Sequence, residues 1–128
     1  MKILIDTHIA LWLFNEYENL SQTAVDCLYN EENELYISIA SAWEVAIKCS
    51  LGKLPEFKGG VKRFLYAIHD KPIEIIGIMP NHIEKVEELP YIHRDPFDRL
   101  IISAALCDDM IILTIDENIK KYDVKCCW

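Results

Sequence analysis

Four acidic residues have types and positions that could hold a metal ion. Asp6 ends one apolar stretch of the sequence, and Asp116 directly follows another. Glu44 lies one turn into a helical pattern, and Asp98 stands at the start of a strongly apolar helical pattern. Carboxylates close to one another repel, so at least one takes a raised pKa unless a cation lies among them.

A hard divalent cation with oxygen ligands, Mg²⁺ or Mn²⁺, is the natural partner of such an acidic cluster. It lowers the pKa of a bound water and stabilises the charge that develops on a phosphoryl oxygen. This is the chemistry of phosphodiester hydrolysis. If the fold brings the four acids together, the sequence therefore predicts a metal-dependent nuclease.

Each acid taken alone also suits a structural role. Asp6 and Asp116 are favoured N-cap residues, and Ser41-x-x-Glu44 has the spacing of a capping box. The segment Asp95-Pro96-Phe97-Asp98 is typical of a helix start, with its first aspartate as the cap and proline at the first helical position. The nuclease interpretation therefore depends on all four acids meeting at one place.

Alternating apolar runs and helical patterns supply the elements that would position these acids. Strands are expected at Lys2–Ile5, Leu35–Ile37, Ile73–Ile76, Met110–Ile115 and Val124–Cys126. Helices are expected around Leu11–Phe14 and at Ser21–Glu32, Ala40–Leu51, Val61–His69, Asn81–Leu89, Phe97–Cys107 and Glu117–Tyr122. This alternation predicts one α/β domain over residues 1–128, a three-layer α/β/α sandwich around a mostly parallel sheet of about five strands. Ligands of such sheets bind beyond the carboxyl ends of the strands, where the acids lie.

Composition limits the function further. The chain has 128 residues, 52% of them hydrophobic, and 13 Lys and Arg against 21 Asp and Glu give a net charge of −8. A charge of this sign excludes the simplest nucleic-acid binder, a basic protein that neutralises phosphates with its own surface. It does not exclude a nuclease whose acids recruit divalent cations.

Basic residues are expected to lie away from most of the acidic cluster. No Lys or Arg is expected beside Asp6, Glu44 or Asp116, and only Arg94 and Arg99 are close to Asp98 along the chain. A basic stretch forms either a solvated helix face or a rim that guides RNA, and its members are Lys48, Lys53, Lys58, Lys62 and Arg63.

Cysteines, tryptophans and histidines add weaker signals. The five cysteines include no C-x-x-C pair, so we expect free, buried thiols rather than a zinc site. Trp12, Trp43 and Trp128 could stack on bases, but packing is the favoured interpretation. His93 could be a pH-sensitive neighbour of Asp95.

Nothing in the sequence indicates a membrane protein. No apolar run approaches the roughly 20 residues that span a bilayer. Asp6 and His8 interrupt the apolar N-terminal stretch, so we expect no signal peptide, no membrane partner and a cytoplasmic location.

Motifs along the whole chain resemble the PIN-domain family, and within it the VapC-type toxins of bacterial toxin–antitoxin pairs. The matching segments are Lys2-Ile3-Leu4-Ile5-Asp6-Thr7, Ser38 through Trp43-Glu44-Val45, His93-Arg94-Asp95-Pro96-Phe97-Asp98-Arg99, and Ile112-Leu113-Thr114-Ile115-Asp116. They occur in the family's order and at its intervals.

The resemblance implies a metal-dependent endoribonuclease that acts on RNA. Its acidic constellation corresponds to Asp6, Glu44, Asp98 and Asp116, which would hold one or two Mg²⁺ or Mn²⁺ ions that activate water. Asp95, Thr7 and Thr114 would take supporting roles, the threonines by orienting water or substrate or simply as turn hydroxyls. The resemblance also implies a homodimer and a small antitoxin whose tail covers the active site.

Two other functions stay open at this point. One is a non-catalytic interaction module that keeps the fold and binds a partner, and the other is a solitary nuclease that processes RNA. A phosphoacceptor receiver domain is disfavoured, because Asp6 is followed by Thr7-His8 rather than a second acid.

Overall fold

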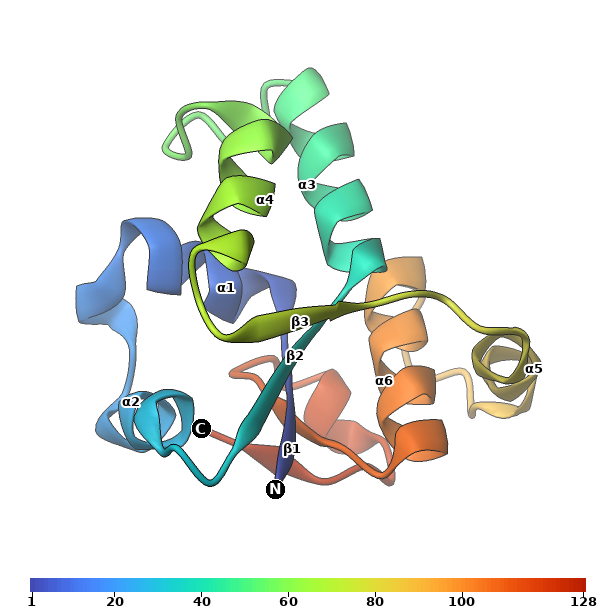
Figure 1. The fold of residues 1–128 in the computed structure, drawn as a ribbon. Helices are drawn as coiled ribbons and strands as arrows, with labels where there is room; N and C mark the ends of the chain where they lie inside the picture. Colours follow the sequence, from blue (N-terminus) through green and yellow to red (C-terminus); the bar gives the residue numbers. More distant parts are fainter.

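The computed structural model describes all residues from Met1 to Trp128 (Figure 1). Its strands are β1 (Lys2–Ile5), β2 (Glu34–Ser38), β3 (Ile73–Ile76), β4 (Ile111–Leu113) and β5 (Cys126–Cys127). Its helices are α1 (Thr7–Asn15), α2 (Gln22–Tyr29), α3 (Ile39–Ser50), α4 (Gly60–His69), α5 (Pro80–Glu88) and α6 (Pro96–Asp108), with 3₁₀ turns η1 (Tyr17–Asn19) and η2 (Ile119–Lys121). None of the helices is both long and apolar enough to cross a membrane.

The five strands form one parallel sheet in the order β3-β2-β1-β4-β5. β1 lies at its centre, paired with β2 on one side and β4 on the other. A strand in this position is covered on both faces, which explains why Ile3, Leu4 and Ile5 are fully buried and the run is continuously aliphatic.

Helices cover both faces of the sheet and make it the middle of three layers (Figure 1). Ile3 and Ile5 point to a core that includes side chains of α1, α2, α3 and α4. Leu4, between them, points to the opposite core, which α6 dominates with Ile101 and Ile102. The predicted α/β/α sandwich with a five-stranded parallel sheet is confirmed.

The chain beyond α6 departs from the predicted elements. The strand expected at Met110–Ile115 ends at Leu113, because the Thr114 hydroxyl accepts the N–H of Asp116 and turns the chain. The last strand begins two residues later than expected, since the N–H of Val124 still donates to the carbonyl of Tyr122 in a turn. The helix expected at Glu117–Tyr122 is a single 3₁₀ turn.

Further differences lie elsewhere in the chain. The helix expected at Ser21–Glu32 stops at Tyr29, because the Asn30 side chain accepts the N–H of Glu32 and forms a turn. The turn η1 was not expected from the sequence. The five cysteines are half-buried free thiols, a more exposed setting than the one expected.

Candidate active site

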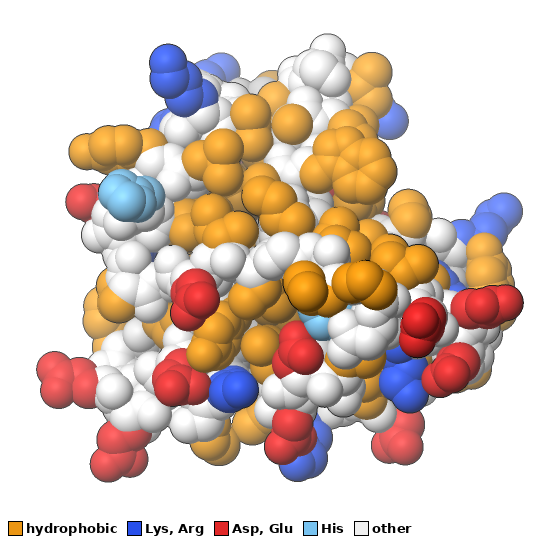
Figure 2. All heavy atoms as spheres, turned by 45° about the vertical axis from the view of Figure 1, so that its right-hand side comes forward, with side chains coloured by type: hydrophobic (Ala, Val, Ile, Leu, Met, Phe, Trp, Pro, Cys, Tyr) orange, Lys and Arg blue, Asp and Glu red, His pale blue; other side chains and the backbone are white.

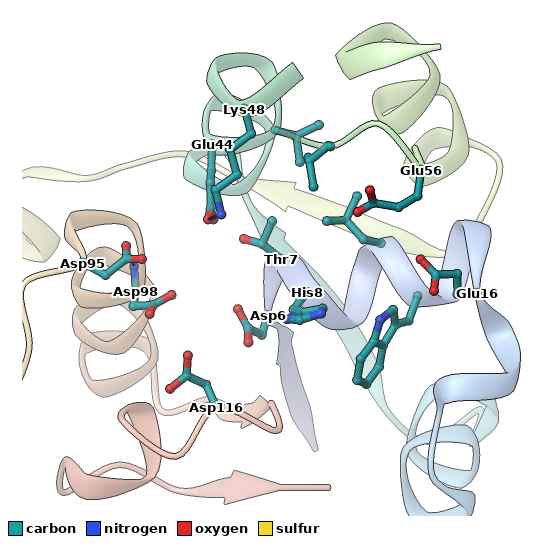
Figure 3. Close-up of a pocket in the computed structure, with 14 residues that line it drawn as sticks. Asp6, Thr7, His8, Glu16, Glu44, Lys48, Glu56, Asp95, Asp98 and Asp116 are labelled. Atoms are coloured by element: carbon teal, nitrogen blue, oxygen red, sulfur yellow. Dashed lines mark hydrogen bonds and ion pairs between the residues drawn. The ribbon is translucent and has the colours of Figure 1, made fainter. Parts of the chain in front are cut away.

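A pocket of about 280 Å³ lies at the carboxyl edge of the sheet (Figure 3). Its lining includes all four acids singled out from the sequence, Asp6, Glu44, Asp98 and Asp116, together with Asp95 and Thr7. The parallel strands end on this side, and helices α1, α3 and α6 begin there (Figure 1). The acids come from positions up to 110 residues apart in the sequence and meet because the sheet places β1 between β2 and β4.

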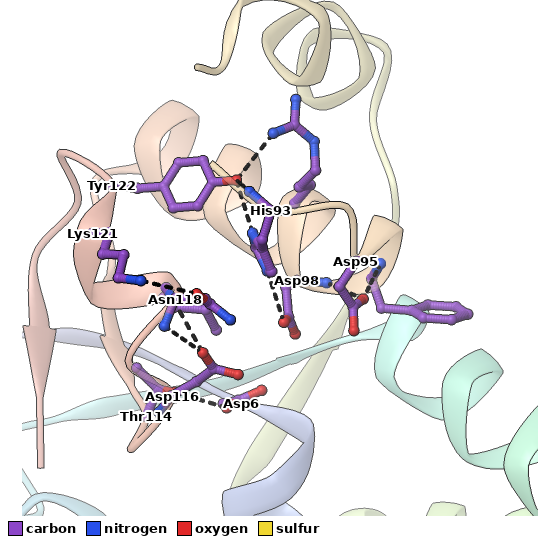
Figure 4. A network of polar contacts seen from close by, with 12 residues as sticks. Asp6, His93, Asp95, Asp98, Thr114, Asp116, Asn118, Lys121 and Tyr122 are labelled. Atoms are coloured by element: carbon purple, nitrogen blue, oxygen red, sulfur yellow. Dashed lines mark hydrogen bonds and ion pairs between the residues drawn. The ribbon is translucent and has the colours of Figure 1, made fainter. Parts of the chain in front are cut away.

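Asp6 and Asp116 are held together through Thr114. The hydroxyl of Thr114 donates to Asp6 Oδ2 over 2.8 Å and accepts the backbone N–H of Asp116 over 3.0 Å (Figure 4). Asp116 Oδ1 in turn accepts the N–H groups of Asn118 and Ile119 and so fixes the start of η2. Thr114, fully buried, acts on the carboxylates and not on solvent.

Glu44 is buried on α3 and makes an ion pair that was not expected. Its Oε2 accepts from Lys48 Nζ over 2.7 Å, one helical turn along. Its other oxygen, Oε1, is buried and has no hydrogen-bond partner. The expectation that no basic residue lies beside this acid is therefore wrong, and the (i, i+4) spacing of the pair was the signal for it.

The capping box proposed for Glu44 is also wrong. The N-cap of α3 is Ser38, whose hydroxyl accepts the N–H of Ala40, and Ser41 lies inside the helix. The Ser41 hydroxyl instead accepts from the Thr7 hydroxyl over 2.8 Å, in a buried contact between α1 and α3. Glu44 is thus free of any capping role, and Thr7 serves to join the two helices behind the pocket.

Asp95 and Asp98 divide two roles at the start of α6. Asp95 is the N-cap, as predicted, and its Oδ1 accepts the N–H groups of Phe97 and Asp98. The Asp98 side chain points toward Asp6 and Asp116 (Figure 3), and its Oδ2 lies 3.1 Å from His93 Nε2. The sequence suggests His93 as a neighbour of Asp95, but the histidine pairs with Asp98 instead.

The environment of the pocket disfavours charge on two of its acids. Burial raises the pKa of Asp6 to about 6, and repulsion from Glu44 and Asp116 adds to it, against the Thr114 hydrogen bond, which lowers it. Burial also raises the pKa of Asp98 to about 8, with repulsion from the surrounding carboxylates in the same direction. A divalent cation would reverse both effects, because it stabilises the ionised form.

The donor set fits a hard divalent cation in chemistry, although the side chains do not yet enclose one. The unpartnered Glu44 Oε1 and the two acids of raised pKa are oxygen ligands without sufficient counter-charge. No three Asp, Glu, His or Cys side chains lie close enough together to chelate an ion as they stand. Lys48 holds one oxygen of Glu44 and His93 one oxygen of Asp98, which leaves the second oxygen of each carboxylate for an ion.

Two acidic residues of the pocket, Glu16 and Glu56, were not singled out from the sequence. They face its outer end, and His8 lies between them and Asp6 (Figure 3). Trp12 also lines the pocket. Trp12 packs against Trp128, with ring centroids 5.7 Å apart. Trp43 was expected to be packed but is 56% exposed beside Phe97.

Comparison with solved structures identifies chains of the same fold. A chain of VapBC2 from Rickettsia felis, solved with a DNA fragment from the promoter of the complex, is 17% identical with a TM-score of 0.75, covering 99% of this chain and 98% of that one. A chain of DNA-bound VapBC from Salmonella typhimurium is 13% identical with a TM-score of 0.70, at 99% and 97% coverage. A domain of a functionally unknown protein from Methanocaldococcus jannaschii is 15% identical with a TM-score of 0.56, at 99% and 89% coverage.

Sequence comparison assigns the family directly. No curated protein is similar enough in sequence to count as a match. Residues 3–125, nearly the whole chain, match the family described as PIN domain. The parallel sheet, the acidic pocket at its carboxyl edge and this match agree, and the chain belongs to the PIN domain family.

Proposed function

We propose that this protein is a divalent-metal-dependent endoribonuclease, the VapC-type toxin of a toxin–antitoxin pair. One observation carries the proposal. Asp6, Glu44, Asp98 and Asp116 line one pocket, and a buried oxygen of Glu44 has no partner within the protein. A solitary RNA-processing nuclease would use the same site, so the toxin assignment rests on the likeness to chains of VapBC complexes.

The four carboxylates would hold the Mg²⁺ or Mn²⁺, and the remaining polar groups would position them. When bound, the ion supplies activation of a water and stabilisation of charge on the scissile phosphate. Thr114 fixes one oxygen of Asp6 and so directs the other oxygen of that carboxylate. Asp95 orders the first turn of α6, which carries Asp98.

Lys48 is the one lysine or arginine that lines the pocket. Its side chain is 44% exposed, so it can leave Glu44 and meet a phosphate of the substrate without losing hydration on the way. The other members of the basic stretch lie further out, and Arg63 is tied to the Phe14 and Lys58 carbonyls. Of that stretch, Lys48 is therefore the residue we assign to RNA.

The shape and charge of the pocket also suit an antitoxin. Glu16 and Glu56 continue the acidic lining away from the four carboxylates. A basic, extended antitoxin tail laid along the pocket would pair with these acids and cover the carboxylates. Such a protein acts on RNA in the cytoplasm, and we place this one there.

A second copy of the chain would cover an exposed apolar face. Hydrophobic side chains gather over α3, α4 and the β3 edge of the sheet (Figure 2). Trp43, Ile75 and Met79 are 56%, 40% and 53% exposed. Apolar surface of this kind on a soluble chain marks an interaction site, and we propose that it forms the homodimer.

RNA cleavage by metal-free protein, with and without added Mn²⁺, tests the function. Total cellular RNA is the probe, and we expect cleavage that requires the metal. Asp6→Asn keeps the shape of the side chain and removes its charge, and should lower the cleavage rate roughly 100-fold or more, because a metal ion contributes several kcal/mol to such a transition state.

Asp70→Asn is the matched control, since Asp70 is an exposed aspartate at the end of α4, outside the pocket. It should cleave like the wild type. Cleavage that persists without metal, or that Asp6→Asn leaves unchanged, would contradict the proposal. If neither the wild type nor Asp70→Asn cleaves RNA or binds Mn²⁺, the interaction module replaces the nuclease as the better interpretation.

A further inference from the structure

Three residues linked by hydrogen bonds lie behind Asp98, on the side away from the pocket (Figure 4). Arg99 Nη1 donates to the Tyr122 hydroxyl over 3.0 Å, and that hydroxyl lies 2.8 Å from His93 Nδ1. His93 Nε2 lies 3.1 Å from Asp98 Oδ2. Arg99 and Tyr122 are buried, and the His93 side chain is only 13% exposed.

The Arg99 guanidinium is fixed by neutral acceptors and by no carboxylate. Its Nη1 also donates to the Pro90 carbonyl over 3.0 Å, and its Nη2 donates to the Val86 carbonyl over 3.2 Å. The Tyr91 ring lies over it, 4.6 Å from Cζ to the ring centroid. A guanidinium stays protonated in proteins and can only donate. Arg99 is therefore the donor in its hydrogen bond to the Tyr122 hydroxyl.

Counting donors and acceptors fixes every proton that follows. The Tyr122 oxygen accepts from Arg99 and from the backbone N–H of His93, at 3.0 and 3.3 Å, which uses both of its lone pairs. Its single O–H must therefore donate to His93 Nδ1. An Nδ1 that accepts leaves the ring proton on Nε2, and that N–H points at Asp98 Oδ2.

We propose that Arg99, Tyr122 and His93 are positioning residues, which hold His93 in its Nε2–H tautomer and through it fix the carboxylate of Asp98. With Oδ2 held by His93, the other oxygen of Asp98 is turned toward Asp6 and Asp116, where the proposed metal ion would bind (Figure 4). The tautomer is set by the fold alone. The effect on metal binding rests on the proposed function.

The tautomer is measured by ¹⁵N NMR of the imidazole rings in the metal-free protein. A fixed Nε2–H tautomer separates the shifts of the two ring nitrogens widely, and a mixture brings them together. His82 is the internal reference for a fixed ring, because the backbone N–H of Met79 donates to its Nδ1 over 3.1 Å. His69, exposed at the end of α4, is the reference for a free ring.

The direction of control is tested by removing Asp98. In Asp98→Ala we expect His93 to keep the fixed pattern, because Tyr122 and Arg99 set it from the other side. In the double variant Asp98→Ala/Tyr122→Phe the ring should move to the pattern of His69. Asp98→Leu, which also offers Nε2 no acceptor, gives the same reading if the alanine variant fails to fold.

A different result in either protein overturns the assignment. An Nδ1–H ring or a doubly protonated ring at His93 in the wild type would show that the proton count is wrong. A ring that relaxes in Asp98→Ala would show that the carboxylate sets the tautomer, and Arg99 and Tyr122 would then be only packing residues.

Mn²⁺ binding to the metal-free protein tests the consequence for the site. Loss of a hydrogen bond to a metal-ligating side chain typically weakens binding by about 10- to 100-fold. We expect Tyr122→Phe and His93→Leu to fall in this range. His93→Gln, whose amide N–H can reach Asp98, should recover most of the affinity. Tyr66→Phe, at a tyrosine that is 71% exposed, is the control and should bind as the wild type does.

A merely structural role predicts a different outcome for the same variants. Tyr122→Phe would then lower the melting temperature and leave the Mn²⁺ affinity unchanged, which overturns the positioning role. The two proposals also fail separately. If the protein binds no Mn²⁺, the metal-dependent nuclease is refuted, and the ring shifts of His93 still decide the tautomer.

Discussion

The two edges of the sheet both carry a hollow lined by aspartates, but those aspartates differ in their burial and in their charged partners. At the carboxyl edge Asp6 and Asp98 are buried among other carboxylates. At the amino edge Asp108 and Asp109 line a hollow with Lys2 and Lys125, close to the starts of β1 and β5. Residue type alone does not separate the two places.

Burial and partners do separate them. The Asp109 side chain is 94% exposed and lies 3.9 Å from Lys125 Nζ, a contact that solvent screens. Asp108 pairs with His82 and is 34% exposed. Of the residues that line the pocket at the carboxyl edge, only Lys48 is a lysine or arginine, and one buried oxygen of Glu44 is left unpaired. An acidic cluster becomes a candidate metal site when it is buried with too little counter-charge, and acid count by itself is a poor guide.

The strongest way to break this comparison is to neutralise one aspartate at each end of α6. Asp98→Asn should lower the rate of Mn²⁺-dependent RNA cleavage by roughly 100-fold or more, because the site loses a ligand charge. Asp109→Asn keeps a residue that tolerates its left-handed backbone (φ 51°) and should cleave normally. Equal rates for the two variants would show that the edges do not differ in function.

The pH dependence of stability should sharpen the comparison in the metal-free protein. The pKa values of Asp6, about 6, and Asp98, about 8, lie above the ordinary value of 3.8, so the folded state binds more protons than the unfolded state between these limits. The free energy of unfolding therefore falls as pH rises from about 4 through about 8. Thermal unfolding should show a loss of several degrees for a domain of this size.

Added Mn²⁺ and the substitution Asp98→Asn should each reduce this loss of stability at high pH. Mn²⁺ favours the ionised carboxylates, so it should raise the melting temperature more at pH 8 than at pH 5. Asp98→Asn has no carboxyl to titrate and should flatten the curve, whereas Asp109→Asn should leave its slope unchanged. If stability depends on pH with the same slope in the wild type, Asp98→Asn and Asp109→Asn, then the ionisation of Asp98 does not destabilise the fold.

Removal of the one cation at the carboxyl edge should have a smaller effect. Lys48 pairs with Glu44 Oε2 over 2.7 Å and competes with a metal ion for that oxygen. Lys48→Met should therefore bind Mn²⁺ roughly three- to tenfold more tightly, since a partly exposed pair of this kind contributes about 1 kcal/mol. Lys85→Met, which removes an exposed pair with Glu88 on α5, is the control for titration calorimetry. Weaker binding by Lys48→Met would show that Lys48 supports the site.

The smallest expected effect is a gain of stability at the amino edge. Asp109 holds a positive φ at the C-terminus of α6, a backbone conformation that glycine adopts without strain. Asp109→Gly should raise the free energy of unfolding by up to about 1 kcal/mol, seen as a small rise in the denaturation midpoint. A loss of stability would mean that the Lys125 contact matters more than the backbone conformation.

Much of the fold could be predicted from the sequence because several of its helices and strands have clear apolar patterns. β1 was predicted with its observed bounds because it is a short aliphatic run. α6 was predicted within one residue at each end because the Asp95-Pro96 pair marks its start and most of the residues after Arg99 are apolar. The elements after α6 were placed less well. There a threonine hydroxyl decides where β4 ends and a short turn decides where β5 begins, and hydrophobic periodicity does not report such bonds.

The site divides in the same way. The four acids could be singled out because they follow strands or lie near the starts of helices, which is a local property of the sequence. Lys48 beside Glu44 was missed although the spacing was visible, because the lysine was grouped with other basic residues. The hydroxyl of Tyr122 on His93 could not have been foreseen, since it joins residues 29 positions apart through tertiary packing alone.

The order of the strands has a consequence for how the protein is made. β1 is made before the other strands of the sheet, yet its second neighbour, β4, is the fourth of the five strands to be synthesised, and Asp116 follows it. All strand pairs are parallel, so no two neighbouring strands can pair through a short hairpin. During synthesis the central strand therefore stays unpaired on one side until β4 has been made, and the acidic pocket lacks Asp116 until after that. Topology alone thus makes the four acids meet only after residue 116 has been synthesised.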